Sequence, residues 1–234
     1  MMNHNWISVH SANERMPRHR HPEAYAAVVL AGGYIEAGDH GRIHVQPGNV
    51  VIHVAHEAHQ DHFSKAGASV LNIPLMEGPL MGGIDAMIGR VPDPDAIARL
   101  SEHDIAGAAA LLKETIEPQD LRLADWPDRL AAALASSLDF SIEDWAAGMG
   151  LAPPSISRGF RQVYGVSPKR YRLEQRTLQT INQLRTWTGS LADVAAVSGF
   201  ADQAHLSRAV SALTGFAPKR LRVKSVQDRC RACQ

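Results

Sequence analysis

The spacing of apolar residues changes along this chain, and the N-terminal third has the spacing of short strands. Residues 24–30 form an apolar run that ends at Gly32-Gly33, and residues 50–54 form another after Pro47-Gly48-Asn49. Residues 70–75 are a further strand candidate. Apolar runs bounded by such turn residues predict β-strands. Many short strands with this punctuation favour a small barrel or sandwich over about residues 1–76.

From about residue 92 to residue 117, apolar positions recur every three or four residues, as on one face of a helix. The stripe consists of Ile105, Ala108, Ala109, Leu112 and Ile116. Glu102, Lys113 and Glu117 fall outside it. Such a stripe suits packing on the chain's own strands as well as pairing with a second copy of the chain. The pattern leaves both alternatives open.

Residues 141–222 contain one helical pattern twice. Ser157-Arg158, Gly165 and Pro168-Lys169-Arg170 recur 50 positions later as Ser207-Arg208, Gly215 and Pro218-Lys219-Arg220. The apolar positions of one helix in each copy match as well: Ile156, Gly159, Phe160 and Val163 in the first, and Leu206, Ala209, Val210 and Leu213 in the second. A repeat that includes the turn residues indicates a duplicated structural unit.

The outward positions of the two repeated helices are small, hydroxyl-bearing or basic, which suits a DNA major groove. A solvated surface helix has the same pattern, but two copies in register favour DNA. Lys169 and Lys219 are expected beside phosphates. The full set of expected DNA-binding side chains is Ser155, Ser157, Arg158, Arg161, Lys169, Arg170, Gln203, Ala204, His205, Ser207, Arg208 and Lys219.

A third helical run, from residue 168 to about residue 188, separates the two copies. Its apolar stripe is Leu178, Ile181, Leu184 and Trp187. Roughly 20 residues at about 1.5 Å each make a rod of about 30 Å. Successive major-groove faces on one side of DNA are roughly 34 Å apart. One chain is therefore expected to reach two neighbouring turns without dimerising.

The span from about residue 125 to residue 222 resembles the paired helix-turn-helix domain of the AraC/XylS family of transcription regulators. The resemblance rests on Leu191-Ala192-Asp193-Val194-Ala195, Gly199-Phe200-Ala201-Asp202, His205-Leu206-Ser207-Arg208, Gly215-Phe216-Ala217-Pro218 and Arg222. It implies an all-α domain with two helix-turn-helix motifs joined by a long helix. Val210 departs from the family's usual aromatic residue, and Pro153-Pro154 open the first recognition helix. Pro154 has no hydrogen-bond donor with which to contact a base.

Charge separates the two parts of the chain, although 24 basic residues balance 24 acidic ones overall. Residues 1–135 hold 10 Lys+Arg and 17 Asp+Glu, a balance of −7, whereas residues 136–234 hold 14 and 7, a balance of +7. The polyanionic partner is therefore expected at the second part. No apolar run approaches the roughly 20 residues of a membrane span, and the N-terminus lacks a signal-peptide layout. We expect a cytoplasmic protein without membrane contact.

Histidine is concentrated in the strand region, which holds ten of the 12. His19-x-His21 on a strand directs both imidazoles to one face, as a metal requires. These residues, with Glu23 and the later His59, resemble the two motifs of cupins. The resemblance implies an effector pocket that includes His19, His21, Glu23, Tyr25 and His59.

The cupin match departs from the usual pattern at two places. Glu23 lies nearer to His21 than the cupin acid does, and His56-Glu57 stands where the motif often has Pro-Gly. Two occupants are therefore considered: a divalent metal on His19, His21 and His59, or an organic effector without metal. Regulators of the resembling family commonly bind an organic inducer without metal, which favours the second.

The sequence thus predicts a two-domain α+β protein. Residues 1–117 form a cupin-like sensor and dimerisation domain, with strands over about 1–76 and helices over about 92–117. Residues 118–124 are a linker, residues 125–222 the DNA-binding domain, and residues 223–234 a disordered tail. The tail holds Cys230 and Cys233, which lack the second pair that a zinc site needs.

The predicted function is that of a sequence-specific transcription regulator that responds to a small-molecule effector. Its expected partners are double-stranded DNA, the effector, a second copy of the chain bound through about residues 102–117, and RNA polymerase. We expect no enzyme activity, because no catalytic base, nucleophile or complete metal triad is assignable. The alternative is a cupin metal-binding or enzymatic module with an appended DNA-binding domain. The residues do not predict the effector, the operator, or activation as opposed to repression.

Overall fold

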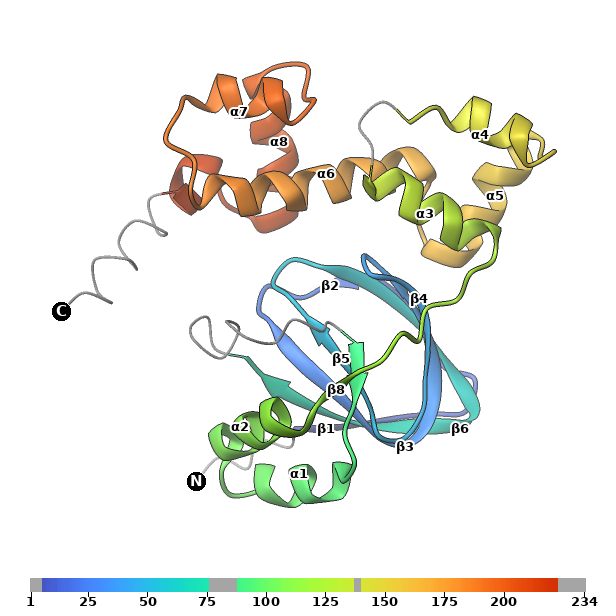
Figure 1. Ribbon diagram of the computed structural model, residues 1–234, viewed down its shortest axis with the longest axis vertical. Helices are drawn as coiled ribbons and strands as arrows, with labels where there is room; N and C mark the ends of the chain where they lie inside the picture. Colours follow the sequence, from blue (N-terminus) through green and yellow to red (C-terminus); the bar gives the residue numbers. More distant parts are fainter. Residues whose placement is uncertain (1–5, 76–87, 137–139, 223–234) are drawn as a thin grey trace. The chain divides into compact units, whose positions relative to one another are not determined.

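The computed structural model describes residues 6–75, 88–136 and 140–222 (Figure 1). The predicted tail, with Cys230 and Cys233, lies outside the described residues. The chain divides into two compact units, Met1–Asp128 with Val163–Gly165, and Arg129–Gln162 with Val166–Gln234. An antiparallel sheet dominates the first unit and helices make up the second. The predicted two-domain arrangement of an N-terminal sheet and a C-terminal helical part is confirmed.

The sheet has eight strands, and every pairing between them is antiparallel. The long strand β6 pairs with three others, β1, β2 and β3, and Figure 1 shows that the sheet is strongly curved. The strands are β1 (Ile7–His10), β2 (Arg15–Arg20), β3 (Tyr25–Gly38), β4 (Gly41–Val45), β5 (Asn49–His53), β6 (Ala58–Pro74), β7 (Ile88–Arg90) and β8 (Glu117–Pro118).

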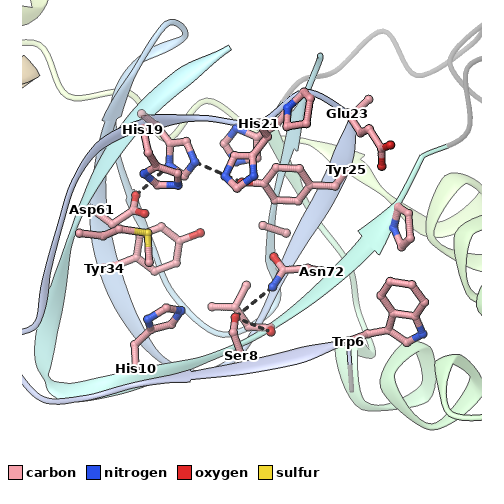
Figure 2. A pocket seen from close by; sticks show the side chains of 18 of the residues that line it. Trp6, Ser8, His10, His19, His21, Glu23, Tyr25, Tyr34, Asp61 and Asn72 are labelled. Atoms are coloured by element: carbon pink, nitrogen blue, oxygen red, sulfur yellow. Dashed lines mark hydrogen bonds and ion pairs between the residues drawn. The ribbon is translucent and has the colours of Figure 1, made fainter. Parts of the chain in front are cut away.

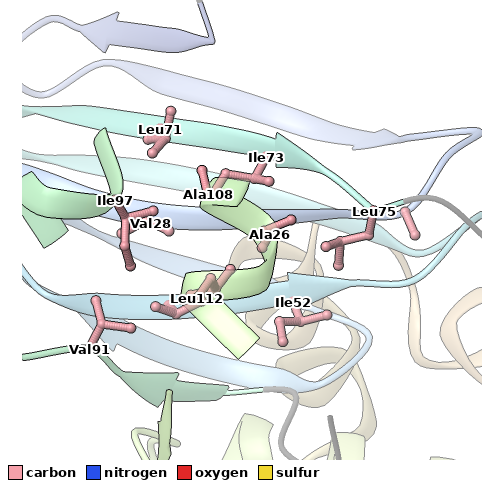
Figure 3. Close-up of a cluster of buried hydrophobic side chains, with 13 residues drawn as sticks. Ala26, Val28, Ile52, Leu71, Ile73, Leu75, Val91, Ile97, Ala108 and Leu112 are labelled. Carbon is pink, nitrogen blue, oxygen red and sulfur yellow. The ribbon is translucent and has the colours of Figure 1, made fainter. Parts of the chain in front are cut away.

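The first half of β3 is buried on both faces, which explains its apolar run without alternation. Ala26 and Val28 belong to one hydrophobic cluster, which also includes Ile97 and Leu112 from the two helices that follow the strands (Figure 3). Ala27 and Val29, between them in sequence, belong to a second cluster on the other face of the sheet. Successive side chains of a strand point to opposite faces, so the one segment contributes to two cores.

Two helices cover the outer face of the sheet, α1 (Pro94–Ser101) and α2 (Ile105–Thr115). Asp93 and Asp104 cap them by accepting hydrogen bonds from backbone N–H groups three residues on. Ala108, Ala109 and Leu112, from the predicted stripe, are buried against the sheet. Of the two alternatives considered for this apolar stripe, the structure therefore shows packing on the chain's own strands.

Irregular pairing between β3 and β6 bends both strands. The register shifts between Val29 and Ala31 and again between Gly32 and Tyr34. Gly32 has φ +72°, and a Cβ there would overlap the carbonyl of Gly67 across the pair. Only glycine fits this close approach without strain. Beyond the bend, the register places Glu36 opposite Asp61.

Residues 117–122, most of them in the predicted linker, lie along the sheet. Glu117–Pro118 forms β8 beside β7, and the backbone N–H of Gln119 donates to the carbonyl of Ile88 at 3.1 Å. Leu121 packs against the second cluster, which contains Ala27 and Val29, and Arg122 forms an isolated antiparallel β-bridge with Ile43. An apolar side chain and unpaired strand edges explain why this segment adheres to the sheet.

The second unit contains two pairs of short helices joined by a long one. The helices are α3 (Trp126–Ser136), α4 (Ile142–Gly148), α5 (Pro153–Tyr164), α6 (Pro168–Leu184), α7 (Leu191–Val197) and α8 (Gln203–Thr214). Within the described ranges, none of the helices is long and apolar enough to span a bilayer.

The apolar residues predicted to face inward are buried in both helix pairs. In the second pair, Val194, Leu206 and Val210 are fully buried with Leu184 of α6. In the first pair, Phe160 of α5 contacts Tyr171 of α6 edge to face, with 5.4 Å between ring centroids. The helix α6 ends at Leu184, four residues before the predicted end near 188. The guanidinium of Arg222 donates to the carbonyls of Thr188 and Gly189 beyond it.

Candidate functional site

The helices α5 and α8 each present an exposed face with side chains able to contact DNA. On α5, Ser155, Ser157, Arg158 and Arg161 are exposed, and on α8 Gln203, Ala204 and Arg208 are exposed while Ser207 is half-buried. Lys169 and Lys219, at the starts of the following helical segments, are also exposed. On each helix the exposed face lies opposite a buried apolar stripe. The residues of the two exposed faces occupy matching positions in the two copies of the repeat.

Two of the predicted DNA-binding side chains are engaged within the chain. The Nε of Arg170 donates to the buried Glu174 carboxylate at 2.7 Å. The ring of His205 is half-buried against Phe200, with 5.3 Å between ring centroids. The two recognition helices also begin differently, because Asp202 caps α8 whereas α5 opens with Pro153 and Pro154.

A cavity of about 430 Å³ lies within the sheet unit (Figure 2). His19, His21, Tyr25 and Asp61 gather at one end, and Trp6, Ser8 and Asn72 lie at the other. Asn72 donates to the Ser8 hydroxyl at 2.9 Å. Apolar side chains including Met16, Phe63 and Val70 line the rest. Polar groups at the ends and apolar walls between them are typical of a small-molecule site.

Three predicted residues, His19, His21 and His59, meet at the histidine-rich end. Donor atoms of all three lie within 4.8 Å of one another. The Nδ1 of His19 lies 3.0 Å from the Pro17 carbonyl, and the Nδ1 of His59 lies 3.1 Å from Asp61. Donation from its Nδ1 leaves the Nε2 of His19 as an acceptor, whereas the Nε2 of His59 faces the Tyr25 hydroxyl at 3.2 Å. We call these three residues the outer histidines.

The other two predicted pocket residues differ in their position. The Tyr25 hydroxyl lies 3.2 Å from the Nε2 of His59, so it belongs to the cluster. Glu23 lines the cavity but is exposed, and in Figure 2 its carboxylate lies away from the imidazoles. Tyr25 thus extends the polar end, and Glu23 contributes at the rim.

Sequence reasoning missed three buried residues beside His59. Glu36 comes from β3, His53 from β5 and Asp61 from β6. The signals were weak but present: Asp61 follows His59 by two positions and so shares its face, and Glu36 is a lone acid within a buried strand. Their approach to one another depends on strand register, which the sequence does not show.

Burial and neighbouring charges shift the pKa values of these histidines in opposite directions. Burial, with His59 and His19 nearby, lowers the pKa of His21 to about 4. Burial also lowers the pKa of His19 and of His53. Burial alone would lower the pKa of His59, but the Glu36 and Asp61 carboxylates outweigh it and raise that pKa to about 9. Burial raises the pKa of Glu36. At neutral pH the cluster therefore offers neutral imidazoles beside one that favours its charged form.

Comparison with known proteins identifies relatives for the helical part and for most of the chain. A family model described as a helix-turn-helix domain matches residues 145–224. The chain is 30% identical over 166 residues to the Arabinose operon regulatory protein of Escherichia coli (strain K12), covering 71% of this chain and 53% of that protein. The corresponding protein of Salmonella typhimurium is also 30% identical over 166 residues, which cover 71% of this chain and 55% of that protein. This chain spans about half the length of these curated relatives.

Two solved structures are among those to which this chain is similar. ToxT from Vibrio cholerae is 11% identical, with a TM-score of 0.40, over 92% of this chain and 97% of that chain. The DNA-binding domain of AdpA, in complex with a target DNA, is 26% identical, with a TM-score of 0.41, over 45% of this chain and 97% of that chain.

Proposed function

We propose that this chain is a transcription regulator of the AraC type, because a helix-turn-helix family model matches its helical part and the arabinose operon regulators are 30% identical to it. As such it would bind duplex DNA and control transcription in response to a small molecule. The observation that carries the proposal is the doubled exposed face of α5 and α8. Basic and hydroxyl side chains recur there at the same repeat positions, Ser157-Arg158 and Ser207-Arg208. The balance of +7 in residues 136–234 supports a polyanionic partner for this part.

We assign α4 with α5, and α7 with α8, as two helix-turn-helix motifs. Support comes from the shared order of a capped short helix, a turn and a helix with an exposed basic face. The α5 and α8 helices would enter successive major grooves, with Lys169 and Lys219 beside phosphates. The domain boundaries at residues 117, 124 and 222 remain part of the proposal.

The curved sheet is proposed as a cupin-like barrel, with the cavity as the effector site. Its volume suits a small organic molecule, whose apolar part would pack on Phe63 and Val70. Neutral imidazoles of His19 and His21 and the Tyr25 hydroxyl would hydrogen-bond to the molecule's polar groups. Ser8 and Asn72 offer polar groups at the opposite end.

The outer histidines also fit a divalent metal. Within the described ranges the Nε2 of His21 is buried without a hydrogen-bond partner, and the Nδ1 contact of His19 leaves its Nε2 available as a ligand. The Nε2 of His59 lies 3.2 Å from the Tyr25 hydroxyl, which the ion would displace. Bound there, a divalent ion would supply an open coordination position to an oxygen atom of the effector. His19, His21 and His59 would hold it, and Asp61 would orient the ring of His59.

We further propose a cytoplasmic homodimer that contacts RNA polymerase and has no catalytic role. A dimer contact through about residues 102–117 would use the exposed side of α2, with Ala106, Ala110 and Glu114, because the stripe with Leu112 is buried. Small side chains on that side would allow close approach of a second helix. Sedimentation of the purified chain tests this part.

Selection of bound fragments from random duplex DNA by the full chain tests the function. We expect one enriched sequence, and binding that weakens by roughly 10³-fold between 50 and 200 mM salt if about six phosphates are contacted. Arg158→Ala combined with Arg208→Ala should weaken binding strongly. Arg99→Ala, an exposed position in α1 of the sheet unit, removes a basic charge elsewhere and should change binding little. Absence of binding at low salt would overturn the proposal.

A further inference from the structure

One edge of the His59 ring faces a buried group of donor atoms that the proposed effector site does not use. The Oε2 of Glu36 lies 3.5 Å from the Nε2 of His53 and 3.6 Å from the Nδ1 of His59. Donor atoms of all three residues lie within 4.8 Å of one another. We call Glu36, His53 and His59 the inner triad, and it shares only His59 with the outer histidines.

The inner triad leaves polar atoms buried and unsatisfied. Glu36 is 2% exposed and His53 is 3% exposed. Among the described residues, neither the Oε2 of Glu36 nor the Nε2 of His53 has a hydrogen-bond partner. Leaving a buried acceptor or donor without a partner is unfavourable, and more so if the group is charged. Two such atoms side by side indicate that a third group belongs between them.

The distances from Glu36 to the two imidazoles exceed those of direct hydrogen bonds and match those between two ligands of one metal ion. N–H···O hydrogen bonds have heavy-atom distances of roughly 2.7–3.2 Å. Two ligand atoms at about 2.0–2.2 Å from a tetrahedral ion are about 3.3–3.6 Å apart. The separations of 3.5 and 3.6 Å from Glu36 to the two imidazoles fall in the second range.

We propose that Glu36, His53 and His59 bind a divalent transition-metal ion, at a position distinct from the outer histidines. Two imidazoles and one carboxylate are a ligand set that suits Zn²⁺ and Fe²⁺, whereas Ca²⁺ and Mg²⁺ prefer oxygen ligands throughout. The proposal does not depend on DNA binding, because it concerns metal content alone.

Neighbouring charges support a cation at the inner triad. The ion replaces the proton on the Nδ1 of His59, and that proton leaves to solvent. Asp61, 3.1 Å from the same nitrogen, remains as a compensating negative charge. The other carboxylates near the cluster have cations of their own: Asp39 is 2.7 Å from Arg18 and 3.9 Å from Arg20, and Glu57 is 2.7 Å from His40.

Two features favour the inner triad over the outer histidines. The triad includes a carboxylate, which offsets the charge of the ion, whereas the outer set consists of three imidazoles. In addition, Glu36 and His53 are almost fully buried, so their polar atoms have less access to water than the half-buried side chains of His19 and His21 at the cavity. Access to the triad is available, since both His53 and His59 line the cavity.

The test is Co²⁺ and Zn²⁺ binding to the purified full chain after stripping with a chelator. Elemental analysis gives the stoichiometry, competition with a chelating dye gives the affinity, and the visible bands of Co²⁺ report its coordination. Wild type should bind one ion per chain. Glu36→Gln, which keeps the shape of the side chain, should weaken binding more than about 100-fold, beyond the roughly 10–100-fold typical of residues that only orient a ligand.

Matched variants separate the inner triad from the outer histidines. His53→Gln should weaken metal binding as much as Glu36→Gln does. If Glu36→Gln does not fold, His53→Gln serves as the test of the inner triad. His19→Gln and His21→Gln should change affinity less than about 10-fold and keep the Co²⁺ bands. The proposal is overturned if wild type binds no ion. It is equally overturned if His19→Gln or His21→Gln weakens binding as much as Glu36→Gln does.

Discussion

Ser190 and Asp193 cap the start of α7 reciprocally. The Ser190 hydroxyl accepts a hydrogen bond from the backbone N–H of Asp193 at 3.1 Å, and the Asp193 carboxylate accepts one from the backbone N–H of Ser190 at 3.0 Å. Two N–H groups that the helix cannot satisfy thus find partners. In the first repeat, Ser141 accepts from the N–H of Asp144 at 3.1 Å at the start of α4.

Replacing Ser190 with alanine should lower the free energy of unfolding of the helical unit by about 1 kcal/mol, within the range of roughly 0.5–2 for lost caps. Thermal unfolding followed by the helical circular dichroism signal measures it. Ser157→Ala, on the exposed face of α5, is the control and should not destabilise. An unchanged stability for Ser190→Ala would show that the cap contributes nothing.

The turn after α4 offers a matched pair of glycines. A Cβ added at Gly148 or at Gly150 would meet nothing within 4 Å, but Gly150 has φ +64° and Gly148 ends the helix. Gly150→Ala should cost about 1–2 kcal/mol, because the left-handed conformation is strained for alanine. Gly148→Ala should instead stabilise by about 0.4–1 kcal/mol. Denaturant unfolding of both variants tests the contrast, and equal effects would contradict it.

Leu112 anchors α2 on the sheet. Its side chain is fully buried among Val28, Ile73 and Ile97 in the cluster of Figure 3. Leu112→Ala should reduce the free energy of unfolding by about 2–5 kcal/mol through lost burial and a residual cavity. Leu111→Ala, next along the helix and only half-buried, should cost clearly less. Equal losses in denaturant unfolding would mean that α2 docks by another face.

Arg208 is predicted to read bases, and this prediction depends on the proposed function. Arg208→Ala should relax base preference at one operator position by roughly 1–3 kcal/mol. Lys219→Ala should weaken binding to all sequences alike, since a phosphate contact carries no sequence information. Competition between the selected operator and single-base variants measures both. A uniform loss for Arg208→Ala would contradict its assignment as a base reader.

Local patterns predicted the elements well because each depends on neighbours in sequence. The stripe with Leu112 gave α2, the repeat gave α5 and α8, and His19-x-His21 gave two imidazoles at one end of the cavity. Tyr25 and His59 also came together as expected. The helices and the His19-x-His21 pair needed only helical or strand periodicity to be placed, whereas the approach of Tyr25 to His59 was expected from the cupin resemblance alone.

Residues brought together by register could not be predicted in the same way. Glu36 and Asp61 are 25 positions apart, and they face each other because two irregularities, near Ala31 and near Gly32, shift the pairing of β3 with β6. A shift by one residue would have turned Glu36 to the opposite face. The end of α6 at Leu184 was also missed, because local periodicity continues to Trp187.

The fixed length of α6 makes the relative placement of the two helix pairs sensitive to residues inserted in this helix. Its 17 residues join the two helix pairs through one continuous rod. One inserted residue would rotate one pair relative to the other by about 100° and so change the angle between the exposed faces of α5 and α8. Seven inserted residues would nearly restore that angle, but they would add about 10.5 Å to the rod. If α5 and α8 bind DNA as proposed, the length of α6 would therefore set both the angle and the spacing between the two faces that contact successive turns of the duplex.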